Sequence, residues 1–236
     1  MTEVPRTAAA VERFFDGWDL TAEESDYLAR HAPRYALLLS LVGEGRVLDV
    51  GANFQTAILR AALGDDQVDA LGLWVPRFAP AGEGGHVVFD LNEIDAPDGV
   101  PSIGPYGTIL VGEVIEHLHR GPATVLRALS SWLAPGGRLV IQTPNAAAAH
   151  KRLRLLAGRP PYERMPEDRT GDGHVREYTA SELLAAGEEA GLRSPRVISA
   201  NYFGGSRGRR LAARAQGLVP SGLRLGLTIV WERPPR

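Results

Sequence analysis

The sequence predicts an α/β protein in which helices cover a central sheet of parallel strands. Short apolar runs alternate with segments of helical periodicity along most of the 236 residues, which is typical of βαβ units. Capping boxes mark two helix starts, at Thr21 with Glu24 and at Thr179 with Glu182, since in each pair the side chains can satisfy free backbone N–H groups. Together these signals favour strands joined by helical crossovers.

The helical region 7–42 comes first, with apolar residues at three- and four-residue spacing. Strands are then expected at 46–51, 68–74, 86–91, 106–113, 138–145, 196–202 and 223–233, and helices at 56–63, 121–137 and 179–192. The helix of 121–137 has Pro122 in its first turn and glycines at its end. The Pro- and Gly-rich link 75–85 predicts an irregular loop. The insertion 146–178 follows a strand end, where α/β proteins build lids and substrate walls.

Composition and length indicate one domain over residues 1–236. The chain is 44% hydrophobic and 23% charged, which is ordinary for a globular domain. It has no cysteine, which excludes disulfides, thiolate catalysis and Cys-ligated zinc. No window approaches the roughly 20 apolar residues of a transmembrane helix, and the N-terminus lacks the pattern of a secretory signal. We expect a cytoplasmic protein without membrane partners.

The net charge of −2 at pH 7 argues against general binding of polyanions. Between Glu189 and Glu232, however, the sequence has no acid and seven arginines: Arg193, Arg196, Arg207, Arg209, Arg210, Arg214 and Arg224. Such a block is either a solvated basic face or a site for a phosphate or carboxylate on a substrate. Both interpretations stay open.

Polar residues recur at the ends of the predicted strands, where ligands bind in open α/β sheets. They are Asp49, Asn53, Asp90, Asn92, Glu113, Glu116, His117, Thr143 and Asn145. Single Asp or Asn residues at such places also cap helices and turns. Their recurrence after successive strands indicates a ligand site at this edge of the sheet.

Five segments, in order from residue 46 to about residue 200, resemble the class I S-adenosylmethionine-dependent methyltransferases. They are RVLDVGANFQT, FDLNE, YGTILVGEVIEHL, LRALSSWLAPGGRLVIQTPN and HVREYTASELLAAGEEAGL. The resemblance implies a Rossmann-like, mostly parallel sheet of seven strands, with the last strand antiparallel and helices on both faces. It also implies that the cofactor lies across the ends of the first three strands.

The resemblance assigns cofactor-binding roles residue by residue. They go to Asp49, Gly51, Ala52 and Asn53 beneath the methionine part and ribose, to Asp90 and Leu91 beside the adenine, and to Glu113 and Val114 near the sulfonium. Physically, glycine lets a backbone approach a ligand closely, and a helix N-terminus favours a carboxylate. The chain departs from the family pattern because only Gly51 remains of the glycine-rich loop. Leu73 and Trp74 stand where the second strand usually ends in a ribose-binding acid.

The stretch GEVIEHLHR sets Glu113, Glu116 and His117 at spacings i, i+3 and i+4, which share one face of a helical turn. Small-RNA 2′-O-methyltransferases and the O-methyltransferases of ubiquinone synthesis share this pattern with a later histidine, here His174. That resemblance implies a divalent metal held by the four residues, of a kind that accepts imidazole, such as Mn²⁺, Fe²⁺ or Zn²⁺. Alternatively, His117 or His174 is a metal-free general base with Glu116 beside it, or the cluster is a solvated helix edge.

The sequence therefore favours a biosynthetic methyltransferase that methylates an oxygen of a small natural-product, sugar or nucleoside-type acceptor, anionic if the arginines bind it. Two alternatives remain. An RNA 2′-O-methyltransferase would explain the Glu and His residues, although the chain has no separate RNA-binding module. A methyltransferase fold that has lost methyl transfer would explain the thinned glycine loop and the missing acid.

Overall fold

The computed structural model describes residues 4–73, 75–78, 85–95, 100–162, 173–202 and 219–235. Its helices are α1 (Ala8–Phe14), α2 (Ala22–Ser40), α3 (Phe54–Leu63), α4 (Pro122–Ser131), α5 (Ala149–Leu156) and α6 (Ala180–Glu189). Its strands are β1 (Val47–Val50), β2 (Val68–Gly72), β3 (His86–Val88), β4 (Tyr106–Gly112), β5 (Leu133–Pro144), β6 (Arg193–Ala200) and β7 (Gly226–Glu232). The sequence predictions for Trp74, Arg207, Arg209, Arg210 and Arg214 lie outside the described residues.

The seven strands form one sheet in the order β3-β2-β1-β4-β5-β7-β6. β1 pairs in parallel with β2 and β4, and the further pairs β2–β3 and β4–β5 are parallel as well. β7 runs antiparallel to both of its neighbours. The predicted fold class is confirmed, including the antiparallel last strand.

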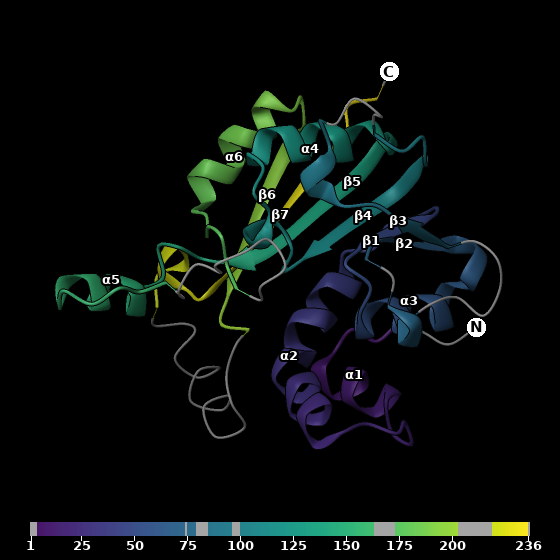
Figure 1. Cartoon of the computed structure of the whole chain (residues 1–236), viewed down its shortest axis with the longest axis horizontal. Coiled ribbons are helices and arrows are strands. Elements are labelled where there is room, and N and C mark those ends of the chain that lie inside the picture. The colour runs from purple at the N-terminus through teal and green to yellow at the C-terminus, as the bar shows by residue number, and fades with distance from the viewer. Residues whose placement is uncertain are drawn as a thin grey trace.

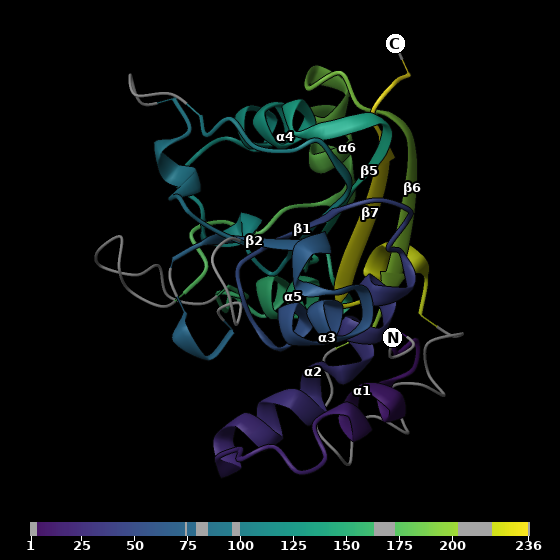
Figure 2. The ribbon, with the colours of Figure 1, turned by 90° about the vertical axis from the view of Figure 1, so that its right-hand side faces the viewer.

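Helices cover both faces of the sheet: α4 and α6 lie on one side, and α1, α2 and α3 on the other (Figure 1 and Figure 2). Side chains along a strand alternate between the two faces, so a strand contributes side chains to two hydrophobic cores. On β4, Ile109 and Val111 belong to the core beneath α4 and α6. Leu110 between them belongs to the core beneath α1 to α3. The sheet is thus buried on both faces, as parallel sheets require.

Several elements differ from the sequence predictions. The strand predicted at 86–91 ends at Val88, and the helix predicted at 121–137 ends at Ser131. The helical region 7–42 is two helices, because the chain turns at Gly17 with φ +88° and starts again at the Thr21 capping box. β5 begins at Leu133, which pairs with Tyr106, earlier than the predicted 138. The insertion 146–178 contains α5, which lies away from both helical layers (Figure 1). In the described part of the chain, no helix combines the length and apolarity needed to cross a membrane.

Candidate active site

A cavity of about 590 Å³ opens at the carboxyl ends of β1 to β4. Its lining comes from the loops after these strands and from the segment 173–175: Val50, Gly51, Ala52, Leu71, Gly72, Leu73, Val75, Phe89, Asp90, Leu91, Asn92, Val114, His117, Leu118, His119, Gly173 and Val175. The volume is in the range of about 300–1,000 Å³ that is typical of small-molecule sites. The cavity lies where open α/β sheets bind their ligands.

Five of the eight predicted cofactor-binding residues line this cavity: Gly51, Ala52, Asp90, Leu91 and Val114. Gly51 adopts φ +85°, and a Cβ added to it would lie 3.0 Å from Cγ2 of Val114. Both facts favour glycine at this position. Its backbone N–H donates to the carbonyl of Leu71 on β2 at 2.8 Å, which holds the loop from β1 to α3 against β2.

Asp49 and Asn53 are not among the described lining residues, and both support the loop from behind. Asp49 has no exposed surface, and its carboxylate accepts from Gln55 Nε2 and from Thr56 Oγ1, each at 2.6 Å. Asn53 is the N-cap of α3, where its Oδ1 accepts from the Gln55 N–H and its Nδ2 donates to the Gly51 carbonyl. These bonds hold the N-terminus of α3 against the glycine turn.

The family's second strand usually ends in a ribose-binding acid, which this chain lacks. No acid replaces it among the described residues that line the cavity at the end of β2, which are Leu71, Gly72, Leu73 and Val75. Asp69, the acid nearest in sequence, is used elsewhere. Its Oδ2 accepts from the Tyr106 hydroxyl at 2.5 Å and from Arg46 at 2.6 Å. Leu73 is 76% exposed, so this side of the cavity presents an apolar side chain and backbone.

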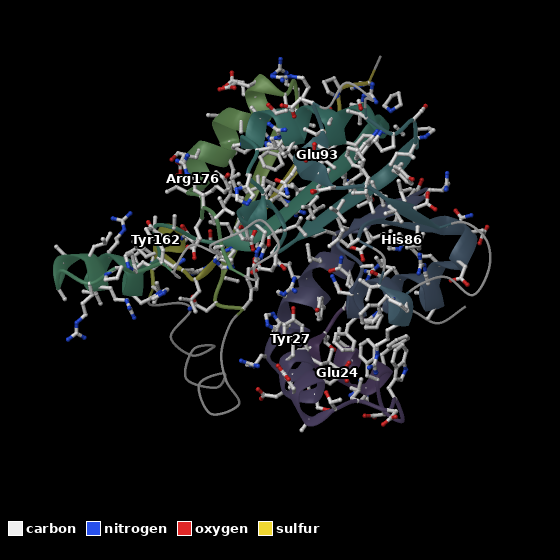
Figure 3. All side chains as sticks on the ribbon, viewed as in Figure 1. Glu24, Tyr27, His86, Glu93, Tyr162 and Arg176 are labelled. Carbon is white, nitrogen blue, oxygen red and sulfur yellow. The ribbon has the colours of Figure 1, made fainter. Side chains whose placement is uncertain are left out.

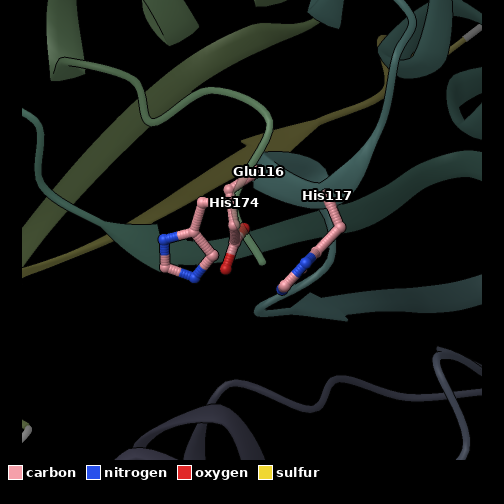
Figure 4. Close-up of side chains that lie close together, drawn as sticks. All are labelled: Glu116, His117 and His174. Carbon is pink, nitrogen blue, oxygen red and sulfur yellow. The ribbon is translucent and has the colours of Figure 1, made fainter. Parts of the chain in front are cut away.

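Glu116, His117 and His174 come together in the folded chain (Figure 4). Their potential ligand atoms all lie within 4.8 Å of one another, and the two imidazole rings meet edge to face with centroids 5.0 Å apart. His117 lines the cavity itself. The three residues therefore lie beside the loops that line the cavity.

Glu113, the fourth predicted metal ligand, is not in this group. The predicted single helical face does not form, because Glu113 adopts φ +58° and the helical turn starts only at Ile115. Burial and the neighbouring Glu116 raise the pKa of Glu113 well above its usual value. Burial also raises the pKa of Glu116, but Thr143 Oγ1 donates to its Oε2 at 2.9 Å and favours the ionised form.

The segment before α6 brings His174 to the cluster through backbone hydrogen bonds. The N–H groups of Val175 and Arg176 donate to the Glu116 carbonyl at 2.8 Å and 3.1 Å. Further along, Ala146 N–H donates to the Tyr178 carbonyl. His174 is therefore fixed relative to Glu116 by the main chain, although the two are far apart in sequence.

Both histidines have Nδ1 next to a hydrogen-bond acceptor. His117 Nδ1 lies 2.9 Å from the Gly173 carbonyl, and His174 Nδ1 lies 3.1 Å from Glu177 Oε1. A carbonyl or carboxylate oxygen only accepts, so Nδ1 is the protonated nitrogen and Nε2 carries the lone pair in each neutral ring.

A family model described as a methyltransferase domain matches residues 22–194, well over half of the chain. The chain belongs to the methyltransferase domain family. It is an S-adenosylmethionine-dependent methyltransferase, as the sequence predicted. No curated protein sequence matches it.

Solved structures share the fold of this methyltransferase at low sequence identity. A Thermotoga maritima enzyme described as a possible histamine N-methyltransferase has a TM-score of 0.58 at 13% identity, over 94% of this chain and 97% of its own. The Haemonchus contortus phosphoethanolamine N-methyltransferase 2, in complex with phosphomonomethylethanolamine and S-adenosylhomocysteine, has a TM-score of 0.56 at 11% identity, over 95% and 60%. The cyclase SpnF has a TM-score of 0.53 at 14% identity, over all of both chains. These likenesses concern the fold alone.

Residues predicted to bind the methyltransferase's cofactor meet at this cavity. A glycine turn at Gly51 permits close approach of a ligand, Asp90 and Leu91 follow β3, and Val114 follows β4. The lining also includes residues that the sequence did not predict, among them Phe89, His119, Gly173 and Val175. They come from loops that meet only in the folded chain. A search for polar residues at the ends of predicted strands therefore does not find them.

A buried arginine of the methyltransferase was also missed. Arg34 on α2 is 2% exposed and reaches β5, where its Nη1 lies 3.4 Å from Gln142 Oε1. Its Nε donates to His31 Nδ1 at 2.9 Å and its Nη2 lies 3.4 Å from the Tyr27 hydroxyl; Figure 3 marks Tyr27 on this helix. The Arg34 charge lowers the pKa values of Glu113 and Glu116 and partly offsets their burial.

Proposed function

We propose that this methyltransferase methylates a hydroxyl oxygen of a small-molecule acceptor. The observation that supports this most is the cluster of Glu116, His117 and His174 beside the cofactor cavity. A hydroxyl must lose its proton as its oxygen attacks a methyl group, and neutral imidazole is the side chain best suited to accept that proton near pH 7.

Bound S-adenosylmethionine supplies a methyl group on a positively charged sulfur, which leaves as a neutral thioether. The chain's own residues then have three tasks. The loop at Gly51 and the residues after β3 hold the cofactor, and the cavity orients the acceptor against it. Nε2 of His117 or of His174 takes the hydroxyl proton as the oxygen–carbon bond forms and the sulfur–carbon bond breaks. Glu116 stabilises the imidazolium that results.

The same three residues also suit a divalent metal ion, which is a second form of the proposal. One carboxylate and two imidazoles, each imidazole with Nδ1 bonded to an acceptor, match the usual ligands and their supporting bonds. Oε1 of Glu116 is buried without a hydrogen-bond partner in the described part of the chain. An ion held there would lower the pKa of a bound hydroxyl.

Transfer of tritium from labelled S-adenosylmethionine to a panel of small hydroxyl compounds, each paired with its amine analogue, tests the proposal. We expect label in hydroxyl compounds and loss of turnover in His174→Ala. EDTA separates the two forms: it abolishes turnover if a metal is used and leaves it intact if a histidine is the base. Label only in the amines would contradict the proposal.

A further inference from the structure

His174 is held from behind by a buried ion pair. Glu177 Oε1 lies 3.1 Å from His174 Nδ1, and Glu177 Oε2 contacts the ammonium of Lys151 on α5. The Lys151 side chain is 7% exposed and that of Glu177 is 5% exposed. We propose that Glu177, fixed by Lys151, is a positioning residue that keeps Nδ1 of His174 protonated and presents Nε2 to the acceptor. This inference rests on the proposed role of His174.

Hydrogen-bond chemistry determines which ring nitrogen of His174 carries the proton. A carboxylate paired with an ammonium accepts hydrogen bonds and donates none. Nδ1 of His174 must therefore be the donor, and the lone pair of the neutral ring is on Nε2. Without that acceptor, a neutral imidazole distributes its proton over both nitrogens, and part of the population presents N–H where the reaction needs a lone pair. Glu177 thus acts on the reaction through His174 and touches no substrate.

The backbone of the segment is anchored independently of this ion pair. Val175 and Arg176 donate to the Glu116 carbonyl, and Tyr178 accepts from Ala146. Lys151 is further confined by the ring of Tyr162, 5.8 Å from its ammonium, beside α5 (Figure 3). Removing the charges of the pair should therefore change the state of the ring more than the position of the chain.

Removing one member alone would take this partner from the other member's buried charge and endanger folding. The test therefore uses double variants. Lys151→Met with Glu177→Leu removes both charges and the acceptor, whereas Lys151→Met with Glu177→Gln keeps a neutral oxygen that can accept from Nδ1. Asp26→Leu with Arg30→Met removes an exposed ion pair on α2 and is the matched control. Thermal melts check that each variant folds.

The main readout is the tautomer of His174, read from ring ¹⁵N chemical shifts and assigned with a His174→Gln spectrum. We expect the Nδ1–H form in the wild type, in the control and in the Met/Gln variant, and a shift to mostly Nε2–H in the Met/Leu variant. In turnover with the acceptor found above, the Met/Leu variant should lose about 10- to 100-fold in kcat, with S-adenosylmethionine affinity unchanged. The Met/Gln variant should recover most of that loss.

An Nε2–H ring in the wild type, or an unchanged ring in the Met/Leu variant, would overturn the inference. So would wild-type kcat in that variant if His174→Ala is inactive. Full activity in His174→Ala would overturn the proposed function and, with it, any catalytic consequence of the pair. The tautomer measurement does not depend on turnover, so the two failures can be told apart.

Discussion

At the scale of single residues, Asp49 behaves unlike an ordinary acid. Burial raises the pKa of its carboxyl from 3.8 to about 7, although Thr56 and Gln55 donate hydrogen bonds that lower it. Between about pH 4 and pH 7 the unfolded chain has already lost this proton while the folded chain keeps it. The contribution of Asp49 to the free energy of unfolding is therefore fully present below the unfolded pKa. It is lost as the pH rises through the folded pKa.

Asp49→Asn removes this titration and can still bond to Gln55 and Thr56. Relative to the wild type, its free energy of unfolding should rise by about 3 kcal/mol from pH 4 to pH 7. Urea denaturation at several pH values measures the difference, and Asp16→Asn, at an exposed position, controls for the loss of one carboxylate. A difference that stays constant over this range would show that Asp49 is already ionised in the fold.

Asp90 is exposed at the cavity lining after β3, where its carboxylate can accept from the adenine amino group. We expect Asp90→Ala to weaken S-adenosylmethionine binding by about 1.5–3 kcal/mol, since it removes a charge-assisted hydrogen bond. Calorimetric titration measures this. Asp95→Ala is the matched control, because Asp95 is an exposed acid nearby that pairs with Arg120. Unchanged affinity in Asp90→Ala would place the adenine elsewhere.

At the scale of elements, the turn from β1 to α3 has a backbone that only glycine fits easily. We expect Gly51→Ala to lose about 1–2 kcal/mol of stability from its positive φ. Its Cβ would also press on Val114, so cofactor affinity should fall about tenfold or more. Gly136→Ala is the control, since Gly136 has φ +75° but open space around it.

Chemical denaturation and calorimetry on the two glycine variants separate backbone strain from loss of the site. The account is supported if both variants lose similar stability and only Gly51→Ala loses affinity for S-adenosylmethionine. Equal cofactor affinity in both variants would mean that the turn does not contact the cofactor.

Local signals predicted the elements that local chemistry determines. Thr21 and Thr179 start helices where their capping boxes indicated. Successive side chains of a strand such as β4 point into the cores on opposite faces of the sheet. The break near Gly17 is also a local signal, which the three- and four-residue spacing of apolar residues obscured. The start of β5 at Leu133 depends on pairing with Tyr106, and no property of residues 133–137 alone indicates it.

At the scale of the whole molecule, the site was predictable where one strand end determines it. Gly51, Asp90 and Val114 follow strands and line the cavity. Glu113 departs from the predicted metal set because its positive φ turns the chain before the helical turn begins. Arg34 lies on α2, Lys151 lies on α5, and Glu177 precedes α6. Only the assembled fold brings these distant segments near the site.

The measurement that tests the central claim most directly is methyl transfer by His117→Ala, His174→Ala and the double variant, with calorimetry of S-adenosylmethionine on the same samples. We predict that kcat falls by about 10²- to 10⁴-fold while the cofactor still binds, because the histidines act on the acceptor's proton. His150→Ala, an exposed histidine on α5, should keep wild-type turnover. Full activity in the double variant would contradict the account and leave the cluster without a chemical role.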